Sequence, residues 1–340
     1  MNIQRSRPPR PRCRSLMGLQ VLGTGSYVPD AVITNDHLHN RFGCDQEWIV
    51  KQTGIHERRH ALDNQATSDL CVEAAQRCLE KVDVSPGSVD LLLVATVTPD
   101  MSFPSVACLV QDRLKLTCAA VDLQAACAGF VYALITGAAY VASGASDLCL
   151  IIGGDCMSRV VNPADIKTYP LLGDGAGAVL LARGRPDQGI VNYSLGAEGR
   201  GKDLLTRPAC GSRLPPTAEL IAQGLHYMQM DGRAVFNWAA SILCDTIQDV
   251  LRVSQLQPGD VNLYIPHQAN IRIINAAIDV LRIDRSLVYT NLDRYGNTSA
   301  GSVPIALDEA YAEGRIQLGD RIILSGYGAG LAWGTALLRW

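Results

Sequence analysis

Short runs of consecutive apolar residues alternate along the chain with longer segments of helical periodicity. Six such runs predict buried strands, and they cover residues 89–97, 118–124, 147–154, 176–182, 261–266 and 320–328. Strands that are apolar on both faces are typical of a sheet covered by helices on both sides. The pattern therefore predicts an α/β fold built from layers of sheets and helices.

The longest uncharged segment lies between Asp122 and Asp147 and consists mainly of small residues. Its length raises the question of a membrane span. Large aliphatic side chains are few, however, and no aromatic or basic residues flank it as membrane anchors. A helix that is apolar all round and made of small residues is typical of the centre of a large core. We therefore expect a buried central helix and no membrane association.

A weak internal repeat relates the two halves of the chain. In each half, an apolar strand is followed after 36–38 residues by a polar residue, Cys127 or Asn297. A further 17 residues lead to a glycine, Gly144 or Gly314, and then to another strand. Because repeated sequence indicates repeated structure, we expect the two halves, residues 17–185 and 186–340, to have similar folds.

The charge distribution separates the first 16 residues from the rest. They hold five of the 30 basic residues and no acidic one. Because the whole chain has a net charge of −3, the remaining residues together carry a net charge of about −8. An acidic body argues against nucleic acid as a partner. Residues 1–16 lack the apolar core of a secretory signal and only weakly resemble a transit peptide. We expect a disordered tail or a translation start assigned too early, with the folded chain beginning at Met17.

The cysteines provide a further constraint. There are eleven, an odd number, and no two of them form a CxxC pair. This spacing favours neither a zinc framework nor an extracellular disulfide scaffold. Reduced thiols in a cytoplasmic protein fit the pattern better.

Cys127 stands near the start of the predicted central helix, where it has a candidate chemical role. A helix N-terminus places positive partial charge and free N–H groups beside the thiol. We therefore expect the pKa of Cys127 to fall from about 8.5 to roughly 3.5–7.5, which would make it a nucleophile. A buried, inert thiol is the alternative, and it is the usual role of an isolated cysteine.

Two residues of the second half are candidates to act with this thiol. His267 directly follows an apolar strand, and Asn297 occupies the position that the repeat assigns opposite Cys127. Taken singly, His267 could be structural and Asn297 a helix cap. If the halves pack about a pseudo-twofold axis, all three residues converge between them.

Three glycine-rich stretches require separate interpretation. We interpret Gly23–Pro29 as a turn, because it lacks the third glycine and the following helix of a dinucleotide fingerprint. Gly173–Ala182 lacks the lysine of a phosphate loop and leads into a strand. Gly326–Gly334 follows a strand and could present backbone N–H groups that complete an oxyanion hole.

Several motifs in order resemble 3-oxoacyl-[acyl-carrier-protein] synthase III, an initiating condensing enzyme of the thiolase superfamily, over residues 17–340. They are GTGSYVPD, DQEWIVKQTGIHERR, DLQAACAGFVYAL, GDGAGAVLLA, PHQANIRII, YGNTSAGSVPIALDEA and GYGAGLAWGTALLRW. The resemblance implies a five-layered αβαβα fold, a homodimer, and Cys127, His267 and Asn297 as catalytic residues. It also implies an oxyanion hole formed by the backbone N–H groups of Cys127 and Ala329.

The resemblance implies a reaction in two halves. Acetyl-CoA or another short acyl-CoA acylates Cys127, and malonyl carrier protein then binds. Loss of CO2 gives an enolate, held by His267 and Asn297, whose carbon attacks the acyl-cysteine. The products are 3-oxoacyl carrier protein, CoA and CO2, which initiates type II fatty acid synthesis. This reaction requires no metal or redox cofactor.

Matching positions imply the binding residues. They are Trp48, Thr53 and Phe103 for CoA and the primer, and Gln268, Arg272 and Arg233 for the acyl carrier protein. Phe103 favours a short primer. The chain departs from the family pattern at four positions, where arginine or lysine is common: Gln52, Ile166, Asn237 and Asp279.

Other functions share some of these features. An acyltransferase of the same fold, or a starter-unit synthase of secondary metabolism, would also use Cys127. A non-catalytic carrier-binding subunit would not need the three intact residues, and a thiol redox protein would need a resolving cysteine. Release of CO2 from malonyl carrier protein distinguishes the condensing enzyme from the acyltransferase.

Overall fold

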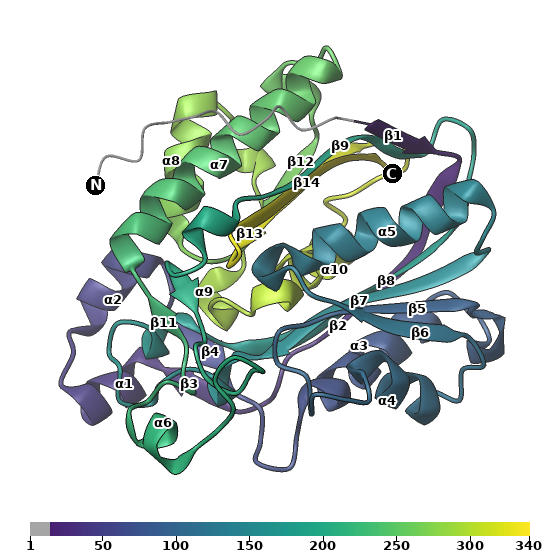
Figure 1. Ribbon diagram of the computed structural model, residues 1–340. Coiled ribbons are helices and arrows are strands. Elements are labelled where there is room, and N and C mark those ends of the chain that lie inside the picture. The colour runs from purple at the N-terminus through teal and green to yellow at the C-terminus, as the bar shows by residue number, and fades with distance from the viewer. Residues whose placement is uncertain (1–13) are drawn as a thin grey trace.

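The computed structural model describes residues 14–340, which form two five-stranded mixed sheets (Figure 1). The first sheet has the order β2 (Leu19–Tyr27), β8 (Asp174–Arg183), β7 (Leu148–Cys156), β5 (Leu91–Ala95) and β6 (Ala119–Leu123). The second has the order β1 (Arg14–Met17), β9 (Gly189–Ala197), β14 (Ala332–Arg339), β13 (Arg321–Gly328) and β12 (Leu263–Pro266). All six strands expected from the apolar runs are confirmed.

The two sheets repeat the same topology. The order β2-β8-β7-β5 in the first corresponds to β9-β14-β13-β12 in the second. In each set the last two strands are parallel and the other neighbours antiparallel. Strands β6 and β1 extend the two sheets at non-equivalent ends. The internal duplication expected from the sequence is therefore confirmed.

Helices form the other three layers. α5 (Gly129–Ser143) and α10 (Ser302–Ala312) contact strands of both sheets and lie between them (Figure 1). α3 (Thr67–Glu80) and α4 (Val106–Arg113) cover the outer face of the first sheet. α7 (Gly232–Val253) and α8 (Ile271–Leu281) cover that of the second. The layers follow the expected αβαβα order.

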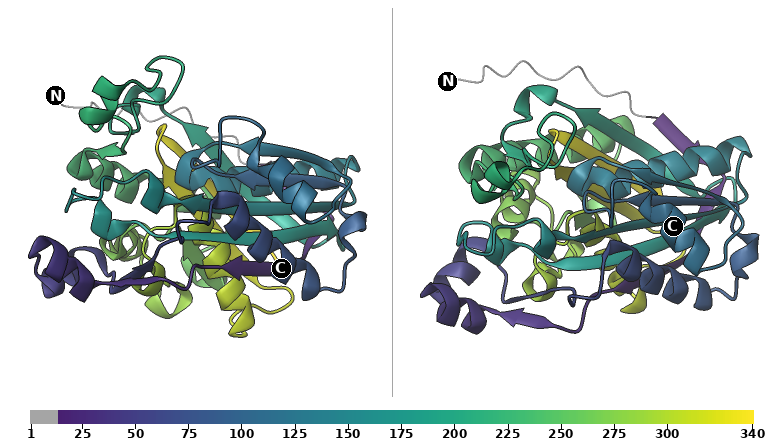
Figure 2. Two further views of the ribbon diagram at one scale, coloured as in Figure 1. Left: turned by 90° about the horizontal axis from the view of Figure 1, so that it is seen from below. Right: turned by 60° about the horizontal axis from the view of Figure 1, so that its bottom comes forward.

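Smaller elements surround one end of the layers. They are α1 (Asn35–Phe42), α2 (Gln46–Thr53), α6 (Ala218–Ala222), α9 (Leu292–Tyr295), and the short pairs β3 (Val32–Thr34) with β4 (Glu57–Arg59) and β10 (Leu205–Thr206) with β11 (Gln229–Met230). Figure 2 shows the purple helices α1 and α2 projecting at this end. Asp45 caps the start of α2 by accepting a hydrogen bond from the Glu47 N–H, and Gly54 ends the helix in the left-handed conformation.

Small residues let α5 occupy the centre of the molecule. A β-carbon at Gly137 would lie 2.6 Å from Ile151 Cδ1 on β7, so the glycine permits close helix–sheet contact. By length and composition, Ala126–Ser143 could also cross a membrane. Its packing between two sheets identifies it as the central helix of the core.

The stretch from Gly23 was expected to form a turn, and that expectation is wrong. Gly23 to Tyr27 continue β2, with an irregularity in the pairing between Val21 and Gly23. The glycines serve helix packing instead: a β-carbon at Gly25 would lie 2.4 Å from the backbone oxygen of Ala74 in α3.

The start of the described chain differs in part from expectation. Arg14–Met17 form β1, which pairs antiparallel with β9, so residues 14–16 belong to the second sheet. The remainder of the expected extension lies outside the described residues. The boundary that we propose between the two halves, at residues 185–186, falls in the connection from β8 to β9.

Gly177 provides a test of how closely the central layer packs. A β-carbon there would lie 2.6–2.7 Å from backbone atoms of Pro304 and Ile305 in α10. Because backbone atoms cannot move aside cheaply, we expect Gly177→Ala to lower the free energy of unfolding by about 1–3 kcal/mol. Thermal or denaturant unfolding measures this. The matched change Gly199→Ala adds a methyl group in open space and should stay within about 0.5 kcal/mol; equal effects would contradict the packing.

Candidate active site

Cys127 lies in a short 3₁₀ turn, Ala126–Ala128, that leads directly into α5. Ala126 has a left-handed backbone conformation, with φ of 48°. The residue is half-buried, and its sulfur lies 3.4 Å from the Ser299 hydroxyl. The end of β13 lies against it, since a β-carbon at Gly328 would be 2.8 Å from the Cys127 backbone nitrogen. The expected position at the start of the central helix is confirmed.

The acidity expected for this thiol is wrong. Burial, together with the nearby Asp155 carboxylate, raises the pKa of Cys127 to about 12, although the hydrogen bond with Ser299 opposes the rise. A helix N-terminus stabilises an adjacent anion by only about 0.3–2 kcal/mol. Loss of water around the thiolate outweighs that effect. In the resting site, Cys127 is therefore a protonated thiol that must lose its proton during the reaction.

His267 follows β12 and is almost completely buried. Its Nδ1 atom lies 2.6 Å from the Ser302 hydroxyl, which in turn accepts a long hydrogen bond from the Gln268 N–H at 3.5 Å. Burial lowers the pKa of His267 to about 3, so the imidazole is neutral at physiological pH. When Ser302 donates to Nδ1, the proton of the ring resides on Nε2.

Asn297 lies in the loop between α9 and the 3₁₀ turn Ser299–Gly301. Its backbone is fixed on both sides, by the Leu171 carbonyl at 2.8 Å and the Gly173 N–H at 3.0 Å. The side-chain oxygen accepts from the Ser299 N–H at 2.8 Å. Within residues 14–340, the side-chain nitrogen has no assigned acceptor, so it is available as a donor.

The equivalence of Cys127 and Asn297 holds only approximately. The helices that follow them end at corresponding glycines, Gly144 and Gly314, both with positive φ. Both helices also follow directly on a three-residue 3₁₀ turn, Ala126–Ala128 before α5 and Ser299–Gly301 before α10. The two residues differ in their place relative to these turns, because Cys127 lies inside its turn and Asn297 stands two residues before the other.

One short segment, residues 297–302, links the three candidates. Asn297 begins it, Ser299 contacts Cys127, and Ser302 contacts His267. The convergence expected between the two halves therefore occurs around this segment.

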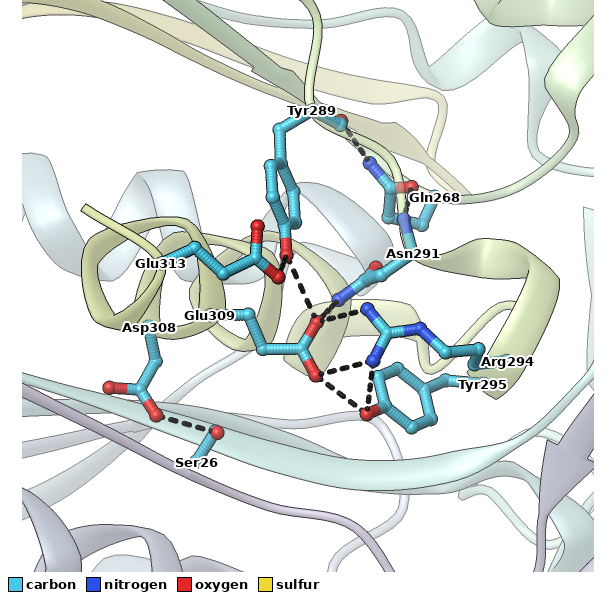
Figure 3. A network of polar contacts seen from close by, with 9 residues as sticks. All are labelled: Ser26, Gln268, Tyr289, Asn291, Arg294, Tyr295, Asp308, Glu309 and Glu313. Atoms are coloured by element: carbon cyan, nitrogen blue, oxygen red, sulfur yellow. Dashed lines mark hydrogen bonds and ion pairs between the residues drawn. The ribbon is translucent and has the colours of Figure 1, made fainter. Parts of the chain in front are cut away.

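A partly buried polar network lies beside this segment (Figure 3). The Glu309 carboxylate of α10 accepts hydrogen bonds from Asn291 at 2.8 Å, Tyr295 at 2.6 Å and Arg294 at 2.8 Å. The Asn291 N–H donates to Gln268 Oε1 at 3.1 Å. The network thus connects α10 and α9 with Gln268, next to His267 at the end of β12.

Two of the expected binding residues have buried side chains. Gln268, expected to contact the carrier protein, is 1% exposed, and its side chain bonds Pro266, Tyr289 and Asn291. Thr53, expected to contact CoA, is buried, and its hydroxyl bonds within the end of α2. Both side chains hold the local backbone, and their contacts with the carrier protein and CoA stay predictions.

The other expected residues lie at accessible positions. Trp48 on α2 is 52% exposed, and Phe103 is 84% exposed. Arg233 at the start of α7 and Arg272 on α8 are exposed, and Arg272 stacks over Phe236 of α7. Its guanidinium also contacts the side-chain oxygen of Gln52, so α2, α7 and α8 meet here. Ala329 directly follows β13 and is half-buried.

Metal binding finds no support in the part of the chain that the structure describes. No group of three or more His, Cys, Asp or Glu side chains there is arranged to hold an ion.

Sequence reasoning missed three residues that contact the candidates or stand behind them. Ser299 and Ser302 are the hydroxyls nearest to Cys127 and His267. Asp155, at the end of β7, is fully buried and accepts from Ala300 N–H at 3.1 Å. Their signals were present: hydroxyls two and five positions after Asn297, and an acid at the end of an apolar strand.

Comparison with known proteins agrees with the fold. Two domain families match, described as 3-oxoacyl-[acyl-carrier-protein] synthase III over residues 121–199 and as its C-terminal part over residues 251–340. The first match contains Cys127, and the second contains His267 and Asn297. Such a layered fold is that of the thiolase-like condensing enzymes, which are acyltransferases.

Full-length relatives identify the family. A beta-ketoacyl-[acyl-carrier-protein] synthase III of Rhodopirellula baltica is 49% identical, over 96% of this chain and 99% of that protein. A beta-ketoacyl-[acyl-carrier-protein] synthase III of Desulfitobacterium hafniense is 46% identical, over 96% of this chain and 98% of that protein. The crystal structure of the 3-oxoacyl-[acyl-carrier-protein] synthase III of Aquifex aeolicus is 40% identical, with a TM-score of 0.88 over 95% of this chain and 100% of that one. The chain therefore belongs to the 3-oxoacyl-[acyl-carrier-protein] synthase III family.

The high pKa of Cys127 predicts how the free enzyme reacts with alkylating agents. Because the thiolate is the reactive form, alkylation by iodoacetamide should rise about tenfold per pH unit from pH 7 to 10, without a plateau. Mass spectrometry of the Cys127 peptide separates it from the exposed Cys108 and Cys210. A plateau near neutral pH would instead show the acidic thiol expected from the helix N-terminus.

Proposed function

We propose that this protein condenses a short acyl-CoA primer, acetyl-CoA in the first place, with malonyl carrier protein. The products are 3-oxoacyl carrier protein, CoA and CO2, and the reaction initiates type II fatty acid synthesis. The observation that carries the proposal is the placement of Cys127 at the start of α5, facing the segment 297–302 that also contacts His267. Membership of the synthase III family supports the reaction type.

In the first half of the reaction, the Cys127 sulfur attacks the primer thioester. The developing oxyanion is held by the backbone N–H groups of Cys127 and Ala329, which donate to it as it forms. The close contact between Gly328 and the Cys127 nitrogen supports this pairing, since it places the end of β13 beside the nucleophile. CoA leaves as the free thiol, with the proton that Cys127 loses, and the acyl group stays on the Cys127 sulfur as a thioester.

In the second half, malonyl carrier protein loses CO2 and its thioester carbonyl becomes an enolate. His267 Nε2–H and the Asn297 side-chain amide donate hydrogen bonds to the enolate oxygen. The low pKa of His267 keeps the imidazole neutral, so it acts as a donor without changing its protonation near neutral pH. The enolate carbon then attacks the acyl-cysteine and releases Cys127.

The substrates approach over the face where α2, α7 and α8 meet. Arg272 and Arg233 supply positive charge for the acidic carrier protein, and the exposed Trp48 supplies a flat surface for the CoA adenine. The Arg272 guanidinium donates a hydrogen bond to the side-chain oxygen of Gln52. Ile166, 39% exposed, offers CoA an apolar contact in place of a charge.

A homodimer in the cytoplasm is part of the proposal. Strand β6 ends the first sheet, and Val121 on it is exposed, so this edge is open to a second copy. The exposed Met101 and Phe103 would be covered in such a dimer, with Phe103 limiting the primer pocket of the partner subunit. The ten cysteines of residues 14–340 are unpaired, which suits a reducing compartment.

Replacing His267 or Asn297 tests whether these two donors act in decarboxylation and not in acylation. We expect His267→Ala and Asn297→Ala to form the acyl-enzyme normally but to lose decarboxylation by about 10²–10³-fold, since each removes an oxyanion donor. Intact-protein mass measures acylation, and labelled CO2 from malonyl carrier protein measures decarboxylation. Cys127→Ser serves as the reference that forms no acyl-enzyme. Normal condensation by Asn297→Ala would refute its role, and acylation without any CO2 release by the native enzyme would favour the acyltransferase alternative.

A charge reversal tests the docking face. Arg272→Glu should raise the KM for malonyl carrier protein about tenfold, because it places like charge against an acidic partner, while the KM for acetyl-CoA changes little. The control is Arg185→Glu, an exposed arginine in the connection between β8 and β9. Equal effects on both substrates would remove Arg272 from the carrier-docking face.

A further inference from the structure

The proposed function needs a hydrogen atom on His267 Nε2, because only then can this atom donate to the enolate oxygen. Burial lowers the pKa of His267 to about 3, so the neutral ring carries a single N–H, on either Nε2 or Nδ1. The group bonded to one nitrogen decides which of the two is protonated. In this structure that group is the Ser302 hydroxyl, which lies 2.6 Å from Nδ1, and both residues are only 1% exposed.

The surroundings of the Ser302 hydroxyl decide the direction of this hydrogen bond. Its oxygen accepts from the Gln268 N–H at 3.5 Å. Within residues 14–340, His267 Nδ1 is the one acceptor that the hydroxyl hydrogen reaches. If Nδ1 carried the ring proton and donated to Oγ, that hydroxyl hydrogen would be buried without an acceptor, at a cost of about 1–3 kcal/mol. The hydroxyl therefore donates to Nδ1, and the ring proton resides on Nε2.

The other contacts of His267 fix the residue and leave Nε2 open. The backbone N–H donates to the Ser325 carbonyl at 2.7 Å, and the carbonyl accepts from the Tyr327 hydroxyl at 3.4 Å. The Tyr327 ring packs edge-on against the imidazole, with ring centroids 5.1 Å apart and planes at 76°. Among the described residues, Nε2 has no hydrogen-bond partner, and it is not sealed from solvent as the unpartnered Nδ1 of His226 is. Nε2 is thus the atom of His267 left for a ligand.

Asn297 is arranged by the same principle. Its side-chain oxygen accepts from the Ser299 N–H at 2.8 Å, which leaves the amide nitrogen to donate. The segment 297–302 therefore supplies a donor to the acceptor atom of each candidate, through the Ser299 backbone and the Ser302 side chain. Both candidates are left with N–H groups free to bind an oxyanion.

We propose that Ser302 is a positioning residue, which fixes the tautomer and ring orientation of His267 so that Nε2–H meets the thioester oxygen of the malonyl carrier protein. This inference rests on the proposed function. Ser302 acts through His267 and does not touch the substrate. An Nε2 atom that already carries hydrogen cannot accept the proton of Cys127, so His267 serves decarboxylation and not acylation.

The tautomer is measured directly in the native protein. After labelling with ¹⁵N-histidine, long-range ¹H–¹⁵N spectra at pH 7 show which ring nitrogen is protonated, and His267→Ala identifies the signals. We expect a protonated Nε2 and an Nδ1 with the shift of a hydrogen-bonded acceptor. Ser302→Ala should remove that shift from Nδ1. A proton on Nδ1 in the native protein would overturn the inference, and this measurement depends on neither the activity nor the folding of a Ser302 variant.

The rates of the two half-reactions separate positioning from a structural role. Ser302→Ala should lower CO2 release from malonyl carrier protein about 10–10²-fold, because a displaced donor no longer meets the oxyanion, while acylation by acetyl-CoA stays close to native. Ser302→Thr keeps a hydroxyl and should recover most of the CO2 release. The control is Ser194→Ala, a buried serine on β9 whose hydroxyl has no partner among the described residues.

Two kinetic results would overturn the positioning role of Ser302. One is CO2 release at the native rate by Ser302→Ala, and the other is an equal loss of acylation and decarboxylation in that variant. A native enzyme that becomes acylated but releases no CO2 would overturn the proposed function instead. The tautomer of His267 is then still decided by the spectra, so the two failures are distinguishable.

Discussion

Direct contact between backbone segments of the two halves is the constraint on which the site depends. A β-carbon at Gly153 of β7 would lie 2.3 Å from the Ala300 oxygen, and one at Gly301 would lie 2.5 Å from the Gly175 oxygen. On the other side, Gly328 of β13 lies against Cys127. These glycines let the turn before α10 pack against β7 and β8, and the turn before α5 pack against β13, without intervening side chains. The nucleophile of one half is thereby enclosed by donors of the other.

The enclosure decides the electrostatics of the site. Removing water disfavours charged forms, so the Cys127 thiol keeps its proton and the His267 imidazole stays neutral. The site therefore works with neutral donors arranged in advance, which suits a reaction whose charge appears only in oxyanions and the enolate.

The sequence predicted the architecture well, because strands buried on both faces and a repeated spacing are local signals. The six strands, the central helix and the duplication all followed from them. The burial and the contacts of the side chains in the site were harder to predict. The helix N-terminus suggested an acidic thiol, but the burial that outweighs it depends on the segment 297–302 and on the end of β13, which lie 170–201 residues further along the chain. Likewise, a motif position could not show that Gln268 and Thr53 point inward, or that Ser299 reaches the sulfur. Those contacts arise only when the two halves pack together.

The central claim is that a primer held on Cys127 is consumed by a decarboxylating partner. Intact-protein mass spectrometry tests it after incubation with acetyl-CoA, isobutyryl-CoA and octanoyl-CoA in competition, followed by malonyl carrier protein. We predict an acetyl adduct on Cys127 that disappears with release of CO2 and formation of 3-oxoacyl carrier protein. A stable, longer acyl adduct that malonyl carrier protein cannot discharge would contradict the account.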